Sequence, residues 1–336
     1  MKKFNQLLKK YPFILIDVGA AGGLMPRLTS TIENIKVIGF EPDERNFNKM
    51  IEEGKLKNPN YEILNTALYS EKTKLNLYLT KKSHDSSIYK PNTDVVKLFP
   101  NPERYEIVEE QLIETENLNN LLVQNHISLP HFIKLDTQGS ELDILKGGSS
   151  CLDHVIGIET EIEFIELYEN QPLFGDVDTY LRGYNFELWD LRKVFSKRAQ
   201  GFDLGKKKGQ LISGDALYLK KIDSIISQMD NFKDLDEKRC YAINSLLISN
   251  AYGLLDYGFK IFNSTKELFS VDEQKELLKG FKKRRYLTIN SSFSHHRYHI
   301  HLWASKFLDW LRKEIQPYDS VGKVGDLDLG NKIKMG

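Results

Sequence analysis

The chain reads Phe13-Ile14-Leu15-Ile16-Asp17-Val18-Gly19-Ala20-Ala21-Gly22-Gly23 near its start. The apolar run predicts a short buried strand, and the small residues after it allow a tight turn that a ligand can approach closely. The glycines do not follow the G-x-G-x-x-G spacing of the dinucleotide-binding turn. Taken alone, this stretch fits an ordinary tight turn as well as a nucleotide-type site.

Further short apolar runs follow, separated by amphipathic stretches. We expect strands at 35–40, 61–68, 75–79, 132–136, 155–162, 186–191 and 216–219, and a helix from about residue 140 to 147. Strands that alternate with helices of about ten residues predict an α/β fold with a mainly parallel sheet covered on both faces. The last two strands lie close together in the chain and are expected to form an antiparallel edge.

Two regions depart from this alternation. Residues 82–106 contain three prolines and no clear period, and a loop of this length after a central strand is expected to be a lid. From residue 222 the pattern becomes helical and rich in aromatic residues, with a further helix expected from Ser291 or Ser292 to Leu311. We therefore divide the chain into an α/β domain at 1–221, a helical extension at 222–318 and a tail at 319–336 that is expected to be disordered.

The composition argues against several classes of protein. The 336 residues contain 47 Lys+Arg and 47 Asp+Glu, and a formal net charge of zero disfavours a dedicated nucleic-acid binder. Two cysteines cannot form a disulfide framework and indicate a reducing compartment. No apolar stretch approaches 18 residues, and the N-terminal run is too short for a secretory signal. We expect a cytoplasmic protein without a membrane span.

Two carboxylates follow predicted strands. Glu41 stands 22 residues after Gly19, where in a doubly wound sheet it can accept both hydrogens of a ribose diol; it can equally be a solvated residue at a helix start. Asp136 ends a central strand, at the crevice where ligands bind in open sheets, and burial there would require a partner. After it, Ser140 is expected to cap a helix whose first turn suits Glu141.

Several segments form a set of motifs in this order along the chain: Asp17-Val18-Gly19-Ala20, Phe40-Glu41-Pro42, Ser86-Ser87-Ile88, Ile133-Lys134-Leu135-Asp136-Thr137-Gln138-Gly139-Ser140-Glu141 with Leu145-Lys146-Gly147, and a longer region from Glu159 to Leu191. Together they resemble the FkbM family of S-adenosylmethionine-dependent methyltransferases. The resemblance covers roughly residues 10–221 and is specific for the family, but it carries no information on the acceptor. Gln138 stands where the family more often has Glu, which puts a role for that carboxylate in question.

The resemblance implies a Rossmann-like class I methyltransferase sheet with strand order 3-2-1-4-5-7-6, strand 7 antiparallel, and S-adenosylmethionine as the cofactor. The first turn would hold the methionine part, Asp17 its amino group, Glu41 the ribose, and the end of the third strand the adenine. Transfer to a hydroxyl oxygen, often of a sugar or polyketide, is implied as well. The expected cofactor-binding residues are Asp17, Gly19, Ala20, Ala21, Gly22, Glu41, Pro42, Asn65, Ala67 and Ser87.

A hydroxyl acceptor needs a general base in the transition state. We expect Asp136 in this role, then His84 in the lid, with Glu159 as a third candidate. Glu159, Glu161 and Glu163 alternate along a strand and point to one face, so Asp136, Glu159 and Glu161 could instead hold a divalent ion. The simpler interpretation, in which Glu159 lines the acceptor cleft and the others face water, leads us to expect no metal.

A histidine-rich stretch lies near the C-terminus. His295 and His299 would share a helical face as two zinc ligands do, but no Cys or acidic partner is close in sequence. An exposed basic helix start is the simpler interpretation. With Lys282-Lys283-Arg284-Arg285 these residues form a basic patch that could contact an anionic glycan, a lipid headgroup or RNA, or only solvent.

These observations predict an O-methyltransferase that uses S-adenosylmethionine on a hydroxyl of a carbohydrate or similar small acceptor. The alternative is an interaction module that retains the fold and uses the helical extension to bind a partner protein or a second copy of the chain. A nicotinamide-dependent oxidoreductase is disfavoured by the glycine spacing. We expect a small-molecule or glycan acceptor as the partner, and neither nucleic acid nor a membrane.

Overall fold

The structure is a computed structural model that describes residues 4–20, 26–54, 57–203 and 209–279. The basic patch and histidine-rich stretch expected after residue 281, the helix expected to end at Leu311 and the tail at 319–336 lie outside the described residues. Within them, no helix combines the length and the apolar character needed to cross a membrane.

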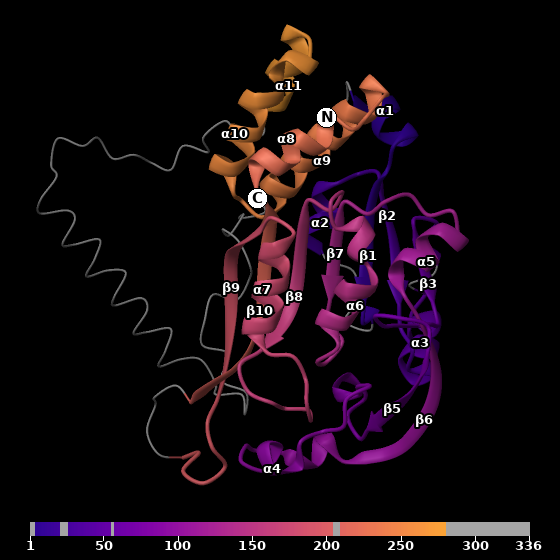
Figure 1. Cartoon of the computed structure of the whole chain (residues 1–336), viewed down its shortest axis with the longest axis vertical. Coiled ribbons are helices and arrows are strands. Elements are labelled where there is room, and N and C mark those ends of the chain that lie inside the picture. The colour runs from indigo at the N-terminus through magenta and orange to yellow at the C-terminus, as the bar shows by residue number, and fades with distance from the viewer. Residues whose placement is uncertain (1–3, 21–25, 55–56, 204–208, 280–336) are drawn as a thin grey trace, which may run out of the picture.

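The chain forms a seven-stranded sheet with the order β3-β2-β1-β7-β8-β10-β9 (Figure 1). Strands β3 to β8 of this order are parallel, and β10 runs antiparallel to both of its neighbours. This is the expected order, so the Rossmann-like class I methyltransferase sheet is confirmed. Its strands are β1 (Phe13–Val18), β2 (Ile35–Phe40), β3 (Tyr61–Leu64), β7 (Phe132–Leu135), β8 (Gly157–Glu163), β9 (Phe186–Ser196) and β10 (Gln210–Lys220).

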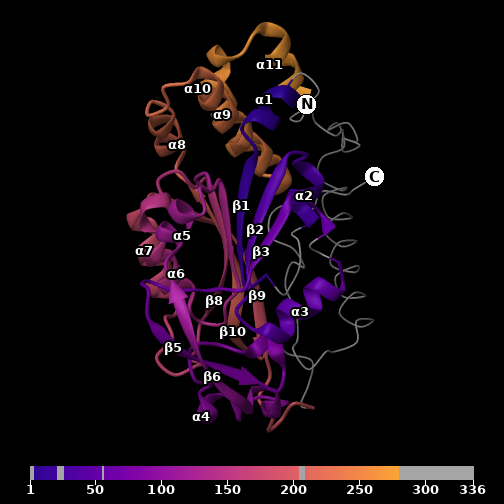
Figure 2. The ribbon, with the colours of Figure 1, turned by 90° about the vertical axis from the view of Figure 1, so that its right-hand side faces the viewer.

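Helices cover both faces of the sheet. In Figure 2, α5 (Leu118–Gln124), α6 (Glu141–Gly147) and α7 (Phe174–Gly183) lie on one face, and α2 (Pro26–Thr31) and α3 (Glu44–Glu52) lie on the other. Successive side chains of β1 divide between two hydrophobic clusters: Leu15 packs in the first and Ile16 in the second. Burial on both faces explains why this strand has an uninterrupted apolar run in the sequence.

Another group of helices gathers beyond the amino ends of the parallel strands (Figures 1 and 2). Tyr241, Tyr252 and Ile261, from this group, are buried in the same cluster as Phe132 and Leu217 of the sheet. The described part of the expected extension therefore shares its core with the sheet. These helices are α1 (Asn5–Lys10), α8 (Ile222–Met229), α9 (Leu235–Ala251), α10 (Leu255–Thr265), the 3-10 helix η7 (Lys266–Leu268) and α11 (Val271–Leu278).

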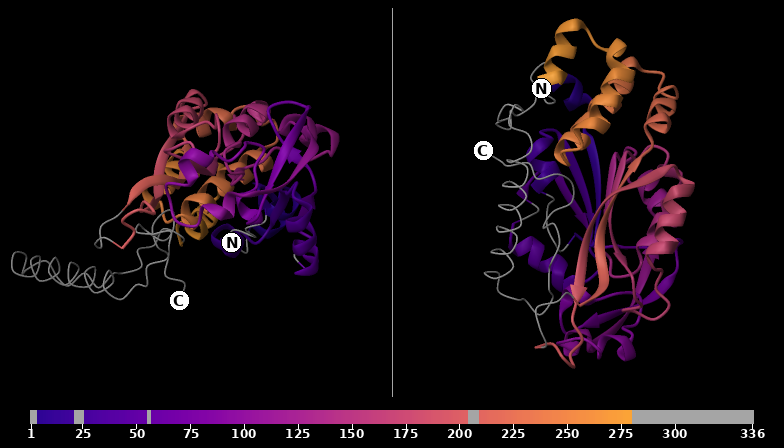
Figure 3. Two further views of the ribbon diagram at one scale, coloured as in Figure 1. Left: turned by 90° about the horizontal axis from the view of Figure 1, so that it is seen from below. Right: turned by 90° about the vertical axis from the view of Figure 1, so that its left-hand side faces the viewer.

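A second, three-stranded sheet with the order β4-β6-β5 lies near the carboxyl ends of the parallel strands (Figure 1). The prediction of a single strand at 61–68 is wrong. This stretch forms β3 of the central sheet and then the short strand β4 (Ala67–Leu68) of the second sheet. Strand β5 (Lys74–Thr80) lies where alternating leucines predicted it, whereas β6 (Ile107–Glu116) was not predicted. The strands β9 and β10 are also longer than expected and form an extended antiparallel pair (Figure 3).

Residues 82–106, expected as a lid, are folded into short elements. They contain the 3-10 helix η4 (Ser83–Asp85), α4 (Thr93–Val96) and the 3-10 helix η5 (Pro102–Tyr105). Val96 packs with Leu167 and Tyr168 in a small hydrophobic cluster of its own, which attaches the segment to the loop after β8. We call residues 82–106 the covering segment below. The 3-10 helix η6 (Ser149–Cys151) completes the described elements.

Gly19 brings the ends of three strands together. Its N–H donates to the carbonyl of Phe40 at the end of β2, and the N–H of Asp136 donates to the carbonyl of Val18, both at 3.0 Å. Gly19 has a φ of 74°, and a Cβ at this position would lie 1.8 Å from the main-chain oxygen of Asp136. Any side chain here would force the turn after β1 away from the end of β7.

We expect Gly19→Ala to lower the free energy of unfolding by at least about 2 kcal/mol, because left-handed strain adds to the collision with the Asp136 carbonyl. Chemical denaturation measures this loss. Gly175→Ala is the matched control: a Cβ at that position in α7 meets no atom within 4 Å, so the change should not destabilise the protein. Equal stability of the two variants would contradict the close approach described here.

Candidate active site

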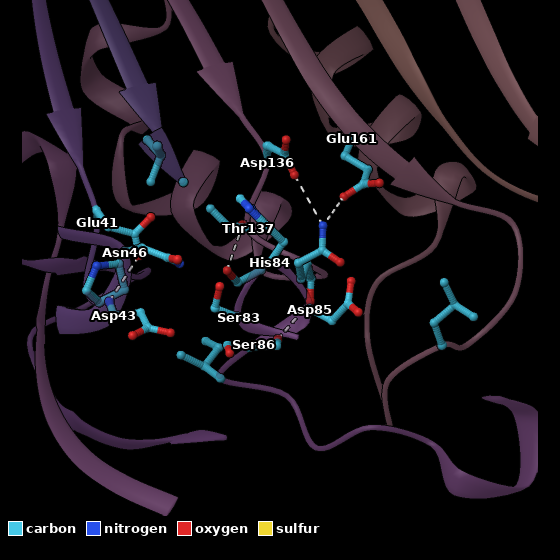
Figure 4. A pocket seen from close by; sticks show the side chains of 18 of the residues that line it. Glu41, Asp43, Asn46, Ser83, His84, Asp85, Ser86, Asp136, Thr137 and Glu161 are labelled. Carbon is cyan, nitrogen blue, oxygen red and sulfur yellow. Dashed lines mark hydrogen bonds between the residues drawn. The ribbon is translucent and has the colours of Figure 1, made fainter. Parts of the chain in front are cut away.

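A cavity of about 450 Å³ opens at the carboxyl ends of the parallel strands. Because β1 and β7 lie in the middle of the sheet, they divide its lining into two parts. Glu41, Pro42 and Ala67 line the part beside β2 and β3, and Glu161 and Glu163 line the part beside β8. We call these the first half and the second half of the cavity. The covering segment contributes residues 82–88 to the lining (Figure 4).

Glu41 is fixed at the end of β2 and is only 4% exposed. Its Oε1 accepts a hydrogen bond from the N–H of Asp43 at 3.0 Å, and the Asn65 amide donates to its main-chain oxygen at 2.8 Å. Asp43, not Glu41, caps α3 by accepting from the N–H of Arg45. Glu41 is therefore a buried carboxylate in the cavity wall rather than a solvated residue at a helix start.

Asp17 lies behind the first turn rather than in the cavity wall. The Lys134 Nζ, on the neighbouring strand, is 3.2 Å from the Oδ1 of Asp17 and 3.8 Å from the Oδ2 of Asp136. Burial by itself lowers the pKa of Lys134, but these two carboxylates outweigh it and the pKa is raised. Lys134 thus lies between the two carboxylates and pairs with both. Ala20 is also buried, and Ala21 and Gly22 lie outside the described residues.

The turn after β7 is held by Glu141. Its Oε1 accepts from the N–H of Thr137 at 2.6 Å and from the Thr137 hydroxyl at 2.9 Å, and its Oε2 accepts from the N–H of Gly139 at 2.9 Å. The prediction that Ser140 caps α6 is wrong, because its hydroxyl donates to Thr137 Oγ1 and makes no cap bond. The turn is satisfied without Asp136, which leaves that carboxylate available to a ligand.

Asp136 lies where the two halves of the cavity meet, with 41% of its side chain exposed. The Gln138 Nε2 donates to Asp136 Oδ1 at 3.2 Å and to Glu161 Oε2 at 2.5 Å (Figure 4). The Gln138 Oε1 in turn accepts from the Tyr168 hydroxyl at 3.1 Å, which fixes the orientation of the amide. Gln138 therefore joins two carboxylates that would otherwise repel each other, a contact that Glu at this position could not make when ionised.

The covering segment is attached to this turn by polar contacts. The Ser87 hydroxyl donates to the main-chain oxygen of Gln138 at 2.7 Å. Arg104 forms a bidentate ion pair with Asp85, whose residue exposure is 3%. These contacts place His84, the second base candidate, in the wall of the cavity (Figure 4).

Glu159, the third base candidate, lies outside the cavity wall. It pairs with Lys134 of β7 and lies on β8 before Glu161, farther from the carboxyl end of the strand. The Tyr252 hydroxyl, at the end of α9, donates to its Oε2 at 2.7 Å. Burial raises the pKa of Glu159. Within the described ranges, no group of three or more His, Cys, Asp or Glu side chains is arranged to hold a metal ion.

Some residues of the second half were not predicted from the sequence. Asp215 lines the cavity from β10 and forms an ion pair with Arg192 of β9. A carboxylate directly before the apolar run at 216–219 was the available signal. Glu163 was noted only as part of an alternating set, and it is buried in the cavity wall. Asn65 lines a neighbouring pocket instead, together with Ala67, which lines both.

The chain is similar to one family model, which is described as the methyltransferase FkbM domain. The match covers residues 17–188, just over half of the chain. It begins at the end of β1 and includes every strand of the central sheet as far as the first residues of β9. No curated protein sequence matches the chain closely enough to show a relationship.

Solved structures similar to this chain include three methyltransferases at low identity. A precorrin-6y C5,15-methyltransferase from Geobacter metallireducens is 8% identical, with a TM-score of 0.33, covering 62% of this chain and 80% of its own. Magnesium protoporphyrin IX methyltransferase from Synechocystis, solved with bound S-adenosylmethionine, is 10% identical, with a TM-score of 0.32 and coverages of 66% and 77%. TrmK from M. capricolum, in complex with S-adenosylhomocysteine, is 9% identical, with a TM-score of 0.32 and coverages of 83% and 98%.

The ion pair between Arg104 and Asp85 is expected to stabilise the covering segment. Arg104→Met leaves a buried carboxylate without its partner and should cost about 3 kcal/mol in the free energy of unfolding. Adding Asp85→Asn to that variant removes the unpaired charge and should restore part of the loss. Urea denaturation measures both changes, and limited proteolysis at 82–106 reports on the segment itself.

Lys81→Met is the control for this experiment. It breaks the ion pair between Lys81 and Glu106, in which both side chains are more than half exposed. The free energy of unfolding should therefore change by less than about 1 kcal/mol. If Arg104→Met proves as stable and as protease-resistant as Lys81→Met, the pair does not hold the covering segment.

Proposed function

The chain belongs to the FkbM methyltransferase family, and on this premise we propose that it transfers a methyl group from S-adenosylmethionine to a hydroxyl of a carbohydrate or similar small acceptor. The cavity of about 450 Å³ lies within the size range of small-molecule sites. Its first half would take the cofactor and its second half the acceptor. The observation that carries the proposal is the position of Asp136 between these halves, exposed to both and not needed by its own turn.

The residues of the first half fit a nucleoside. The buried carboxylate of Glu41 is an acceptor for the two hydroxyl hydrogens of a ribose. Pro42, Ala67 and Leu68 offer apolar wall on either side of it for the adenine ring. Gly19 lines the cavity at the first turn, where the methionine part would lie. Asp17 and Ala20 would shape this turn from behind, and Asn65 would support the end of β2. Ala21 and Gly22, which lie outside the described residues, stay predicted cofactor-binding residues.

When bound, S-adenosylmethionine supplies a methyl group on a sulfonium, which is already activated for transfer to a nucleophile. The protein then has to orient the acceptor hydroxyl and remove its proton. Asp136 is the proposed base, and the Gln138 amide and Lys134 hold its carboxylate in one orientation. The covering segment forms one wall of the cavity, and Ser87 fixes it to the Gln138 turn.

His84 remains the second base candidate, since it lines the same cavity from the covering segment. Glu159 is proposed as a positioning residue, because it lies outside the cavity and is bound by Tyr252. The alternative function, an interaction module that binds a partner through the helical extension, is not specifically supported by the described helices. Their aromatic and apolar side chains Tyr241, Tyr252 and Ile261 are buried in the core. Association through the region after residue 222 stays a prediction.

Glu41→Ala should weaken cofactor binding by roughly 10- to 150-fold, since losing hydrogen bonds to a charged group costs about 1.5–3 kcal/mol. Isothermal titration with S-adenosylmethionine measures the change. Glu41→Gln keeps an oxygen for the N–H of Asp43 and separates a fold defect from a lost ribose contact. Glu52→Ala, an exposed position in α3, is the control and should bind normally. Unchanged affinity in both Glu41 variants would remove the ribose assignment.

Asp136→Asn should lower methyl transfer by on the order of 10²–10⁴, the contribution of a general base, while affinity for S-adenosylmethionine stays nearly intact. The assay follows labelled methyl from the cofactor into a panel of methyl glycosides. His84→Gln in the same assay shows whether the second candidate is needed.

Three outcomes separate the roles of Asp136. Activity that is indifferent to EDTA supports direct base catalysis, whereas activity lost to EDTA and restored by a divalent ion would assign Asp136 to a bound cation. Near-normal turnover of folded Asp136→Asn protein would rule out both roles. Mass spectrometry of glycans from a deletion strain, searched for a lost methyl group, tests the carbohydrate acceptor.

A further inference from the structure

The second half of the cavity contains more carboxylates than cations. Asp136, Glu161, Glu163 and Asp215 line it. Asp215 is neutralised by Arg192 of β9. Asp136 shares Lys134 with Asp17, so that one lysine serves two carboxylates. In the part of the chain that the structure describes, Glu161 and Glu163 of β8 are the two carboxylates of this half that no ion pair neutralises.

The other cations of the cavity wall do not correct this imbalance. Arg104 is committed to Asp85 in the covering segment, and Lys82 is exposed to solvent. Among the described residues, no lysine, arginine or histidine forms an ion pair with Glu161 or Glu163. The strongest contact of Glu161 is the uncharged amide of Gln138.

Glu163 is the clearest case, because it is only 3% exposed and yet lines the cavity. The polar side chain beside it is the uncharged amide of Gln171, which is also buried. A buried carboxylate that lines an open cavity with only an uncharged amide beside it is a costly arrangement for an empty site. A ligand that brings positive charge and hydrogen-bond capacity would complete it.

The pKa directions agree with this view. Burial raises the pKa of Glu163 well above its usual range, and the nearby Glu141 and Asp136 raise it further. Burial and then Asp136 do the same to the pKa of Glu161. A cation placed between the two carboxyls would favour their ionised forms and reverse both shifts.

The cofactor alone does not account for these charges. S-adenosylmethionine brings a sulfonium and an ammonium group, and Asp136, whose main-chain carbonyl lies against Gly19, is the carboxylate of the second half that is next to the first turn. Glu161 and Glu163 extend past the end of β7, opposite Asp215 and Ser213 of β10. They therefore belong to the part of the cavity that would receive the acceptor.

We propose that the acceptor is an amino sugar or a similar amino alcohol, whose protonated amine is bound by Glu161 and Glu163 while a hydroxyl faces Asp136. This inference rests on the proposed function and names the substrate class of the same site. The ammonium would lie between the two carboxylates of β8, within reach of the second half of the cavity. The charge would orient the sugar ring and so select the hydroxyl that is presented to the base.

The test compares sugars that differ at a single ring position, which is either positively charged or neutral. The protein is loaded with S-adenosylhomocysteine, and binding is measured by calorimetry or ligand-observed NMR at neutral pH. The probes are methyl glycosides of the 2-amino sugar, its N-acetyl derivative and the parent sugar, each in the gluco, galacto and manno configurations. In at least one configuration the amine should bind about 10-fold or more tightly than both neutral forms, as expected for charge-assisted hydrogen bonds.

Glu163→Gln should reduce this preference to near unity, and Glu161→Gln should weaken it. Glu166→Gln, an exposed position just after β8, is the matched control and should retain the full preference. Circular dichroism and affinity for S-adenosylhomocysteine identify any variant that is misfolded, in which case the other β8 variant decides. The inference is overturned if no amine binds more tightly than its neutral partners, or if both β8 variants keep the preference.

Methyl transfer from labelled cofactor separates this inference from the proposed function. Equal binding of amines and neutral sugars, with methyl transferred to a hydroxyl, would leave the proposed function intact and refute the amine. A clear preference for amines with methyl found on the nitrogen would support the charge recognition and refute transfer to oxygen.

Discussion

The contact between Gly19 and the main chain of Asp136 is the constraint on which the site depends. The strands β1 and β7 are parallel neighbours in the sheet, and the chain leaves both at the same edge. The turn after β1 and the turn after β7 therefore lie against each other. The two turns can approach this closely because Gly19 has no side chain. A main-chain hydrogen bond from Asp136 to Val18 joins the ends of β7 and β1, and one from Gly19 to Phe40 joins the ends of β1 and β2. Main-chain hydrogen bonds consequently fix the backbone of Glu41 after β2 and of Asp136 after β7, next to the turn that follows β1.

In the turn after β7, different residues stabilise the backbone and orient the Asp136 carboxylate. Glu141 folds back to accept the free N–H groups of the turn, a task that Ser or Asp usually performs at the start of a helix. Gln138, with a φ of 59°, directs its amide between Asp136 and Glu161. Structural requirements are thereby met by residues on either side of Asp136. This division explains how a carboxylate at the end of a central strand can remain partly exposed and still be well positioned.

The sequence predicts the middle of the central sheet well because β1, β2 and β7 are buried almost throughout and carry short apolar runs. Glu41 and Asp136 could be identified because each follows such a run directly. Strand β6 escaped prediction since it is rich in exposed Glu residues and lacks a buried face along most of its length. The position of Glu159 could not be predicted either, because its partner Tyr252 is 93 residues away in sequence, on a helix whose docking no local pattern specifies.

The shared core of the sheet and helices α8 to α10 has a consequence for where this protein can be divided. The family match ends at residue 188, within β9, yet β10 inserts between β8 and β9 and contributes Leu217 and Leu219 to the cluster that contains Tyr252. A fragment cut at the family boundary would leave the edge of β8 unpaired and uncover aromatic side chains. The cooperative unit that resists hydrogen exchange should therefore extend beyond the conserved domain, with the slowest amides divided between the inner strands and α9.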